Sequence, residues 1–385
     1  MLLIITPTML KKIIKQLQQF GLDKKNKPSG RIFSVDALRG FDMFWIIGGE
    51  GIFKALDSIF HNNTSQFIST QLDHAEWLGF RFYDIIMPLF LFIVGVAMPF
   101  SFSKRLAAGD SKSKIMGHVI KRVIILWFLG MLVQGNFLTY SFPDYHFYSN
   151  TLQAIAAGYL ISSVIVLYSN ALVQILSTMG LMLLYWLIMV VLPGGSGVYE
   201  PQQNAALYID KLILGSHQDG TTYTWILSSL NFAATVMLGI FAGYILKSGL
   251  KNMHKVLYLI LFSFICFILA LIWHPVHPII KHIWTGSFVL YAGSFCLLLL
   301  AVFYLIIDVW NFKRWSKMFI IIGANAIVAY VAWHLFDFRH ISDIFIRGLE
   351  QYTGNWYLFI RNTGAFFVLL AILWYMYKRK IFVKL

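Results

Sequence analysis

Residues 82–103 read FYDIIMPLFLFIVGVAMPFSFS, and Asp84 is the single charged side chain in this run. A helix needs about 20 apolar residues to cross the hydrocarbon core of a bilayer, so the run predicts a transmembrane helix. Similar runs occur near 37–60, 119–140, 150–169, 171–192, 225–246, 256–273, 284–308, 316–338 and 356–377. The pattern predicts an all-α fold, a polytopic membrane bundle of about ten helices.

The composition of the 385-residue chain supports a membrane protein. Hydrophobic residues make up 58% and charged residues 12%, against about 45–50% and 25% in soluble chains. These fractions exclude disorder, nucleic-acid binding and a secreted disulfide scaffold. The two cysteines, Cys266 and Cys296, lie inside apolar runs, where they behave as small hydrophobes and predict neither a bridge nor a metal site.

The net charge of +14 is distributed unevenly over the predicted loops. Most lysines and arginines fall on one side of the spans, the positive-inside pattern, which predicts that both termini are cytoplasmic. We expect residues 1–30 to be an uncleaved, amphipathic cytoplasmic segment with a linker, and 31–385 to be the transmembrane domain. The exceptions on the other side are Lys54, Arg81, Lys211, Lys281, Arg339, Arg347 and Arg361.

Three charged residues recur at three-residue spacing at the start of the first predicted span. Asp36, Arg39 and Asp42 share one helix face, so the arginine can form an internally neutralised network with both carboxylates. Arg39 can equally face an anionic ligand such as a phosphate from the cytoplasmic side. The spacing leaves both interpretations open.

The loop between the first two spans is the densest polar region of the chain. It ends in LDHAEWLGFRFYD (72–84) and contains Asp73, His74, Glu76 and Trp77. A histidine can act as a general base near neutral pH, and a neighbouring carboxylate can orient its ring. The alternative is an interfacial histidine and tryptophan that anchor the end of a helix.

Other polar groups have weaker patterns. Asn150 and Gln153 either cap a helix or face a substrate hydroxyl, and Asn325, Tyr330, His334 and Asp337 form either a buried network or part of a site. The histidines of HPVHPIIKH (274–282) lack a carboxylate, so we expect a turn there and no metal.

Several blocks together resemble the heparan-alpha-glucosaminide N-acetyltransferase family. They are SVDALRGFDMFWIIGG (34–49), DHAEWLGFRFYDIIMPLFLFIVGVAMPFS (73–101), KRVIILWFLGMLVQGN (121–136), NTLQAIAAGYLI (150–161), YIDKLILGSHQDG (208–220) and GANAIVAYVAWHLF (323–336). The second block is the most specific. The resemblance covers most of residues 31–377.

The resemblance implies transfer of acetyl from cytosolic acetyl-CoA, across the membrane, to the amine of a terminal glucosamine. It implies that His74 is the active histidine and that Asp84 is the acidic residue of the following helix; we add Asp73 as a catalytic candidate. For the coenzyme A phosphates we expect Arg39, Lys121 and Arg122. The substrate-binding candidates are Glu50, Trp77, Asn150, Gln153, Asn325 and His334.

Two other functions fit the same sequence. An acyltransferase for a hydroxyl of an envelope sugar differs only in the acceptor, and a small-solute transporter would use intramembrane charges as binding sites. The expected partners are an amino sugar, coenzyme A and the lipid bilayer, with a homodimer implied by the resemblance alone. The expected location is a bacterial inner membrane.

Overall fold

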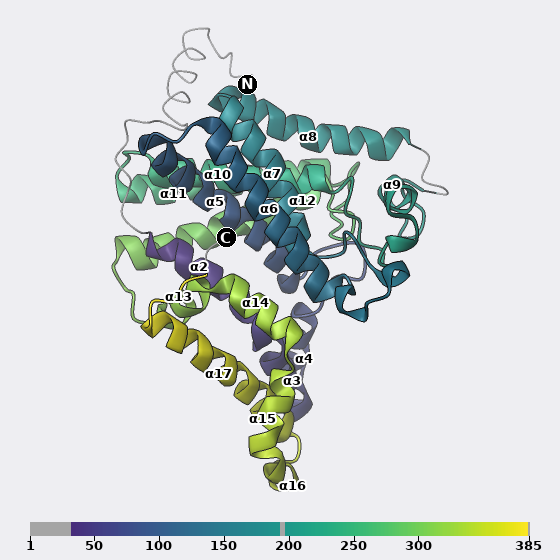
Figure 1. Cartoon of the computed structure of the whole chain (residues 1–385), viewed down its shortest axis with the longest axis vertical. Helices are drawn as coiled ribbons and strands as arrows, with labels where there is room; N and C mark the ends of the chain where they lie inside the picture. The colour runs from purple at the N-terminus through teal and green to yellow at the C-terminus, as the bar shows by residue number, and fades with distance from the viewer. Residues whose placement is uncertain (1–31, 193–196, 384–385) are drawn as a thin grey trace. The chain divides into compact units, whose positions relative to one another are not determined.

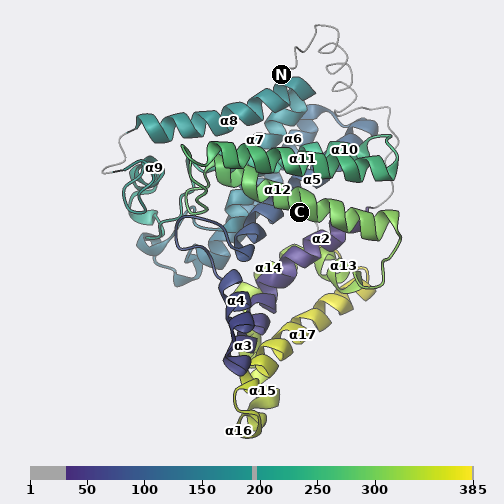
Figure 2. The same cartoon turned by 180° about the vertical axis from the view of Figure 1, so that it is seen from behind.

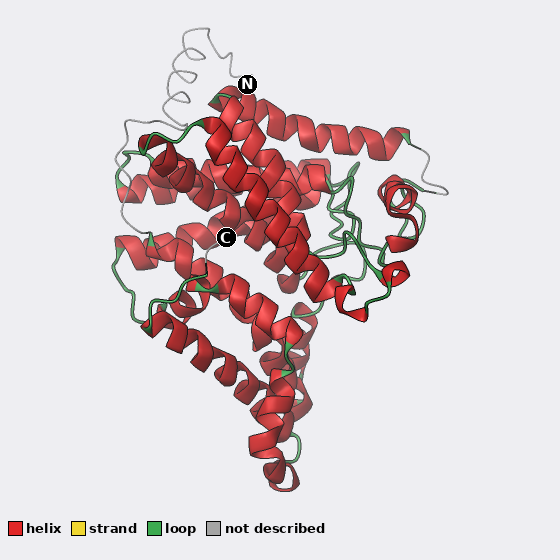
Figure 3. Cartoon of the chain, in the orientation of Figure 1, coloured by secondary structure: helices red, strands yellow, loops and turns green. Residues whose placement is uncertain are grey.

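The computed structural model describes residues 32–192 and 197–383, and every regular element in these ranges is helical (Figures 1 and 3). This confirms the predicted all-α class. The amphipathic segment predicted for residues 1–30 lies outside the described residues. The short helical turns η2–η5 and η7 are Phe82–Ile85, Phe137–Thr139, Phe142–Asp144, Gly215–His217 and Arg347–Leu349.

Eight of the ten predicted spans are uninterrupted helices that are long and apolar enough to cross a membrane. They contain 18–26 residues, or about 27–39 Å at 1.5 Å per residue, which matches a hydrocarbon core of about 30 Å. They are α5 with its leading turn (Phe82–Ala107), α6 (Lys112–Gln134), α7 (Thr151–Tyr168), α8 (Ala171–Val191), α10 (Ser229–Lys247), α11 (Asn252–Trp273), α12 with η6 (Gly286–Val309) and α17 (Trp356–Lys378).

The other two predicted spans are broken helices rather than single continuous ones. The stretch predicted at 316–338 is α13 (Lys317–Ala324) and α14 (Ala326–Leu335), bent by 76°. At the bend, the Asn325 amide donates to the carbonyl oxygen of Ile381 and accepts from the backbone N–H of Val383. These bonds use a buried polar side chain to hold the bend against the C-terminal segment.

The stretch predicted at 37–60 is α2 (Phe33–Phe44), the π-helical turn η1 (Trp45–Gly49) and α3 (Glu50–Phe60). The helix breaks at Ile47 (φ −91°, ψ 26°) and Gly48 (φ 130°, ψ −16°). A φ of 130° is open to glycine and strained for a residue with a Cβ atom. A glycine at position 48 therefore permits the break that the apolar pattern does not reveal.

Replacing Gly48 with alanine is expected to destabilise the protein by about 1–3 kcal/mol, because the backbone strain has no relief. The added Cβ would also lie 3.2 Å from the Trp333 ring. The melting temperature in detergent measures the effect. Gly117→Ala is the control, because a Cβ there meets nothing within 4 Å; equal melting temperatures for the two variants would contradict the argument.

The chain divides into two compact units. Unit 1, as described, comprises residues 91–298 outside the 193–196 gap and includes α9 (Ala205–Leu214). Its central helix is α10, which packs against α7, α8 and α11. A Cβ on Gly95 or Gly239 would lie 2.0 Å from a carbonyl oxygen of the opposite helix, so glycine permits α5 and α10 to touch backbone to backbone.

Unit 2 comprises Ile32–Phe90 and Leu299–Leu385 and contains every element around His74. In it α2 packs closely on α13, and α17 packs on α3. The Asp308 carboxylate accepts from the backbone N–H groups of Phe33 and Ser34, at the start of α2. The helices α3, α4 (Asn63–Gln71), α15 (Phe338–Ile346) and α16 (Glu350–Thr353) gather at one end of this unit (Figures 1 and 2).

Candidate active site

The loop from Leu72 to Arg81 connects α4 to η2, and local hydrogen bonds define both of its ends. Asn62 begins α4 by accepting from the backbone N–H groups of Thr64 and Ser65. The Gln71 side chain at the end of α4 accepts from the backbone N–H of Phe82. The Gln71–Phe82 bond joins the two ends of the loop, and this holds the charged residues between them in place.

The central feature of this loop is a pair formed by His74 and Asp84. Nδ1 of His74 lies 2.9 Å from Oδ1 of Asp84. The Asp84 side chain is fully buried, whereas that of His74 is 41% exposed. A buried carboxylate that holds a solvent-accessible imidazole is the arrangement that general-base catalysis needs.

The second oxygen of Asp84 fixes the carboxylate in the loop. Oδ2 accepts from the backbone N–H of Arg81 at 2.9 Å and from that of Ala75 at 3.2 Å. Since Oδ1 is an acceptor for Nδ1–H of His74, the lone pair of the neutral ring resides on Nε2. Nε2 is therefore the atom that can take a proton from a substrate.

Two further groups orient His74. The guanidinium of Arg81 donates to the carbonyl oxygen of His74 at 2.8 Å. The Tyr83 ring lies 5.1 Å from the imidazole, centroid to centroid. Glu50, on α3, interacts electrostatically with Tyr83, so the surroundings of His74 extend onto α3.

Glu50 belongs to a charged cluster beside the histidine. Lys54 Nζ lies 2.7 Å from the Glu50 carboxylate and 2.6 Å from that of Asp73. The predicted candidates Glu50 and Asp73 are thus brought together with His74. Lys54 was missed, although its four-residue spacing from Glu50 is a recognised signal for an ion pair on a helix.

Asp73 is the neighbour of His74 in sequence, yet its carboxylate faces Lys54. The carboxylate on the imidazole is that of Asp84. Trp77, in the same loop, is half-buried. A catalytic role for Asp73 and a substrate-binding role for Trp77 stay predictions.

Of the charged network considered for Asp36, Arg39 and Asp42, the structure contains one of the two ion pairs. Arg39 lies 3.6 Å from Asp36, as the spacing suggests. Asp42 does not join them: it is fully buried, and neither of its carboxylate oxygens has a hydrogen-bond partner among the described residues. The three-member network is therefore wrong for Asp42.

His334 lies in unit 2 at the edge of a polar hollow of about 600 Å³. Its Nδ1 donates to the carbonyl oxygen of Tyr330 at 2.8 Å. The hollow is also lined by Trp333, Arg339, Asp343 and Arg361. Aromatic and bidentate polar side chains of this kind suit a sugar.

The candidates in unit 1 have structural contacts. Asn150 caps α7 by accepting from the backbone N–H of Leu152, and its amide donates to Gln134. Gln153 accepts from the backbone N–H of Ser149 and donates to the carbonyl oxygen of Phe147. The capping interpretation is confirmed for Asn150, and substrate binding by either amide stays a prediction.

The two cationic candidates of unit 1 lie on α6. Lys121 is exposed, and the Arg122 guanidinium stacks 4.7 Å from the Tyr159 ring centre. A cation over an aromatic face is held without a carboxylate. Both charges therefore stay available for an anion, and their contact with coenzyme A stays a prediction.

The three histidines expected to form a turn have separate partners. Nδ1 of His277 lies 2.8 Å from the Tyr199 hydroxyl, and its Nε2 accepts from the backbone N–H of Gly286. Burial lowers the pKa of His277 to about 3. Nδ1 of His282 is bonded to Thr222, and among the described residues no three metal-binding side chains come together.

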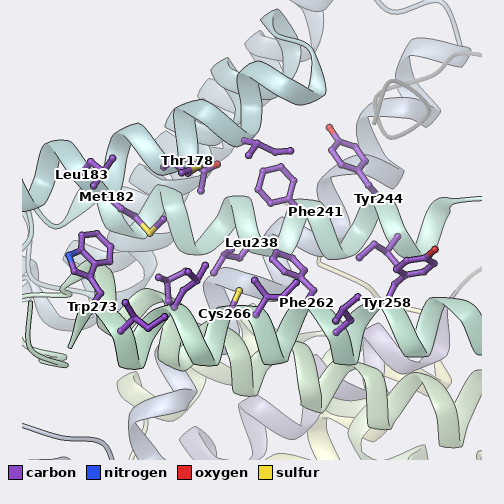
Figure 4. Close-up of a pocket in the computed structure, with 18 of the residues that line it drawn as sticks. Thr178, Met182, Leu183, Leu238, Phe241, Tyr244, Tyr258, Phe262, Cys266 and Trp273 are labelled. Atoms are coloured by element: carbon purple, nitrogen blue, oxygen red, sulfur yellow. The ribbon is translucent and has the colours of Figure 1, made fainter. Parts of the chain in front are cut away.

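A larger cavity, of about 860 Å³, lies in unit 1 and is drawn in Figure 4. Helices α8, α10 and α11 line it with apolar side chains such as Met182, Phe241 and Phe262. It contains no charged side chain. The paired imidazole and carboxylate lie instead in the His74 loop, which is therefore the candidate reaction site.

The helices and the histidine–aspartate pair define an integral membrane protein with an acid–base site in a loop. Residues 31–269 match the family described as "Heparan-alpha-glucosaminide N-acetyltransferase, catalytic", and the chain belongs to this family. It is 25% identical over 376 residues to the human heparan-alpha-glucosaminide N-acetyltransferase, covering 81% of this chain and 55% of the human protein. For the mouse protein of the same name the figures are 24% over 373 residues, 81% and 56%. The chain thus spans about half the length of the curated relatives it matches.

Proposed function

We propose that this protein transfers acetyl from cytosolic acetyl-CoA to the amine of glucosamine, or of a terminal glucosaminide, on the other side of the membrane. The observation that carries the proposal is the His74–Asp84 pair, in the block that most resembles the family. Acetyl-CoA is a co-substrate, and no metal is needed to activate a thioester.

The chemistry requires a neutral amine, a polarised carbonyl and a fixed geometry between them. Nε2 of His74 takes a proton from the amine as the nitrogen attacks the thioester carbon. The carbon–sulfur bond then breaks, and the coenzyme A thiolate receives the proton from the imidazolium. An acetyl-imidazole intermediate on His74 is the alternative route to the same products.

The distribution of basic residues supports the sidedness of the proposal. Positive-inside asymmetry favours cytoplasmic termini in a bacterial inner membrane, with the His74 loop on the periplasmic side. Arg39, Lys121 and Arg122 are our candidates for the phosphates of coenzyme A. The family resemblance favours a homodimer, which mass photometry in detergent can test.

The acceptor end of the proposal rests on the surroundings of His74. Glu50 and Asp73 supply carboxylates for the sugar hydroxyls or its ammonium group. The hollow beside His334 has room for a sugar ring next to Trp333. Gly51 follows Glu50 on α3, and its carbonyl oxygen accepts a hydrogen bond from the Asn362 amide of α17 at 2.8 Å. This bond joins α3 to α17 next to Glu50.

The test is transfer of labelled acetyl from acetyl-CoA to glucosamine by purified protein in detergent. We expect base-stable label in N-acetylglucosamine. Label that mild base removes would identify an ester and hence an O-acyltransferase. Absence of transfer to any sugar together with absence of acetyl-CoA binding would overturn the proposal in favour of a transporter.

A further inference from the structure

Two buried polar groups, one on α2 and one at the start of η1, have no hydrogen-bond partner among the described residues. Asp42 is fully buried and both of its oxygens are unpartnered; the indole Nε1 of Trp45 is buried and unpartnered as well. The two residues are three positions apart, so they share one face of the helix. Buried groups without partners are uncommon in native proteins, and each needs an explanation.

Both groups can act as hydrogen-bond donors. An ionised carboxylate in an apolar interior, without a cation or a donor, carries a large desolvation penalty. Asp42 therefore carries its proton and presents an O–H. The indole of Trp45 has only an N–H to offer, so the end of α2 and the start of η1 present two hydrogen-bond donors without an acceptor among the described residues.

The donors and the histidine pair are connected through η2, which contains Phe82, Tyr83 and Asp84. The Trp45 ring is 5.0 Å from that of Phe82, and the next residue, Tyr83, lies 5.1 Å from the imidazole of His74. Asp42 and Glu50 both lie near Tyr83. Both donors precede the break in the helix at Ile47 and Gly48, where the backbone leaves helical geometry.

We infer that Asp42 and Trp45 donate hydrogen bonds to the carbonyl oxygen of the acetyl thioester, an inference that rests on the proposed function. As the amine nitrogen bonds to the carbonyl carbon, the π-electron pair moves onto the oxygen, where the two donors stabilise the negative charge. When the carbon–sulfur bond breaks, that pair returns to form the amide carbonyl. Asp42 keeps its proton throughout, and proton transfer stays with His74.

A role in stabilising the oxyanion would explain why the carboxyl group of Asp42 is buried without a partner among the described residues. Replacing such a group with a hydrophobe of similar volume is commonly neutral or stabilising. A protonated aspartate at this place therefore contributes no stability that a leucine would not, and a role in function accounts for it. Donors that are fixed before the reaction need no reorganisation when charge develops, and removal of one costs about 10²–10³ in rate.

The experiment compares Asp42→Leu, which removes a donor, with Asp42→Asn, which keeps one, and adds Trp45→Phe, which keeps the ring and removes the N–H. We expect kcat to fall about 10²-fold or more for Asp42→Leu and Trp45→Phe. The decrease should be smaller for Asp42→Asn. The affinity for acetyl-CoA and the melting temperature should stay close to those of the wild type. Trp310→Phe, at an exposed tryptophan, is the matched control and should keep the wild-type kcat.

A second readout does not depend on the acceptor. Infrared difference spectra of bound acetyl-CoA carrying ¹³C at the thioester carbonyl should show a lower stretching frequency in the wild type than in Asp42→Leu or Trp45→Phe. Identical carbonyl bands, or wild-type kcat in both variants while the wild type transfers acetyl, would overturn this inference and leave the proposed function intact. Failure of the wild type to bind acetyl-CoA would overturn both.

Discussion

His74→Ala is expected to lower kcat for acetyl transfer by about 10²–10⁴-fold, the usual contribution of a positioned general base. The amine would then have to lose its proton to water. Since His74 is 41% exposed and sits in a loop, the substitution removes little packing, and the melting temperature should change little. Labelled acetyl transfer at saturating acetyl-CoA measures the effect.

The control is His118→Ala, at an exposed histidine on α6 that has no part in the proposed chemistry. It should retain wild-type kcat. Wild-type turnover by His74→Ala would rule out both the general base and the acetyl-imidazole route. Trapping of acetyl on His74 by acetyl-CoA alone would support the covalent route over direct transfer.

Asp84→Asn is expected to lower kcat by about 10²–10⁴-fold while the loop stays folded. The asparagine oxygen can still accept from the backbone N–H groups of Arg81 and Ala75, as Oδ2 does now. Its amide would instead donate to Nδ1 of His74. That bond forces the ring proton onto Nε2, so the nitrogen that should take the amine proton no longer has a lone pair.

Asp84→Ala separates this effect from folding. It removes the hydrogen bonds to His74, Ala75 and Arg81 together, and should lower both kcat and the melting temperature. Asp110→Asn, in the turn before α6, is the matched substitution away from the site. If Asp84→Asn keeps wild-type kcat, the aspartate does not set the tautomer of His74.

Most of the membrane fold could be predicted from the sequence because apolar length determines which segments can cross a bilayer. The apolar pattern did not reveal two places where the backbone of a predicted span breaks. Gly48 lies at φ 130° in a run that contains Asp42, Glu50, Lys54 and Asp57. Asn325 lies at a 76° bend in a run that is apolar enough to be one span. Hydrophobicity reports burial, whereas a break depends on the packing and hydrogen bonds at that position.

Within the site, the order of residues alone places His74 among carboxylates in the most polar loop of the chain. Which carboxylate contacts its imidazole depends on how the loop folds. Asp73 is adjacent in sequence, but the chain turns its side chain to Lys54, while Asp84, ten residues on, reaches the imidazole. The same holds for Asp42, whose spacing from Arg39 allows an ion pair that the fold does not form. Spacing fixes which residues share a helix face, whereas the contacts of a side chain depend on which neighbouring elements bury it.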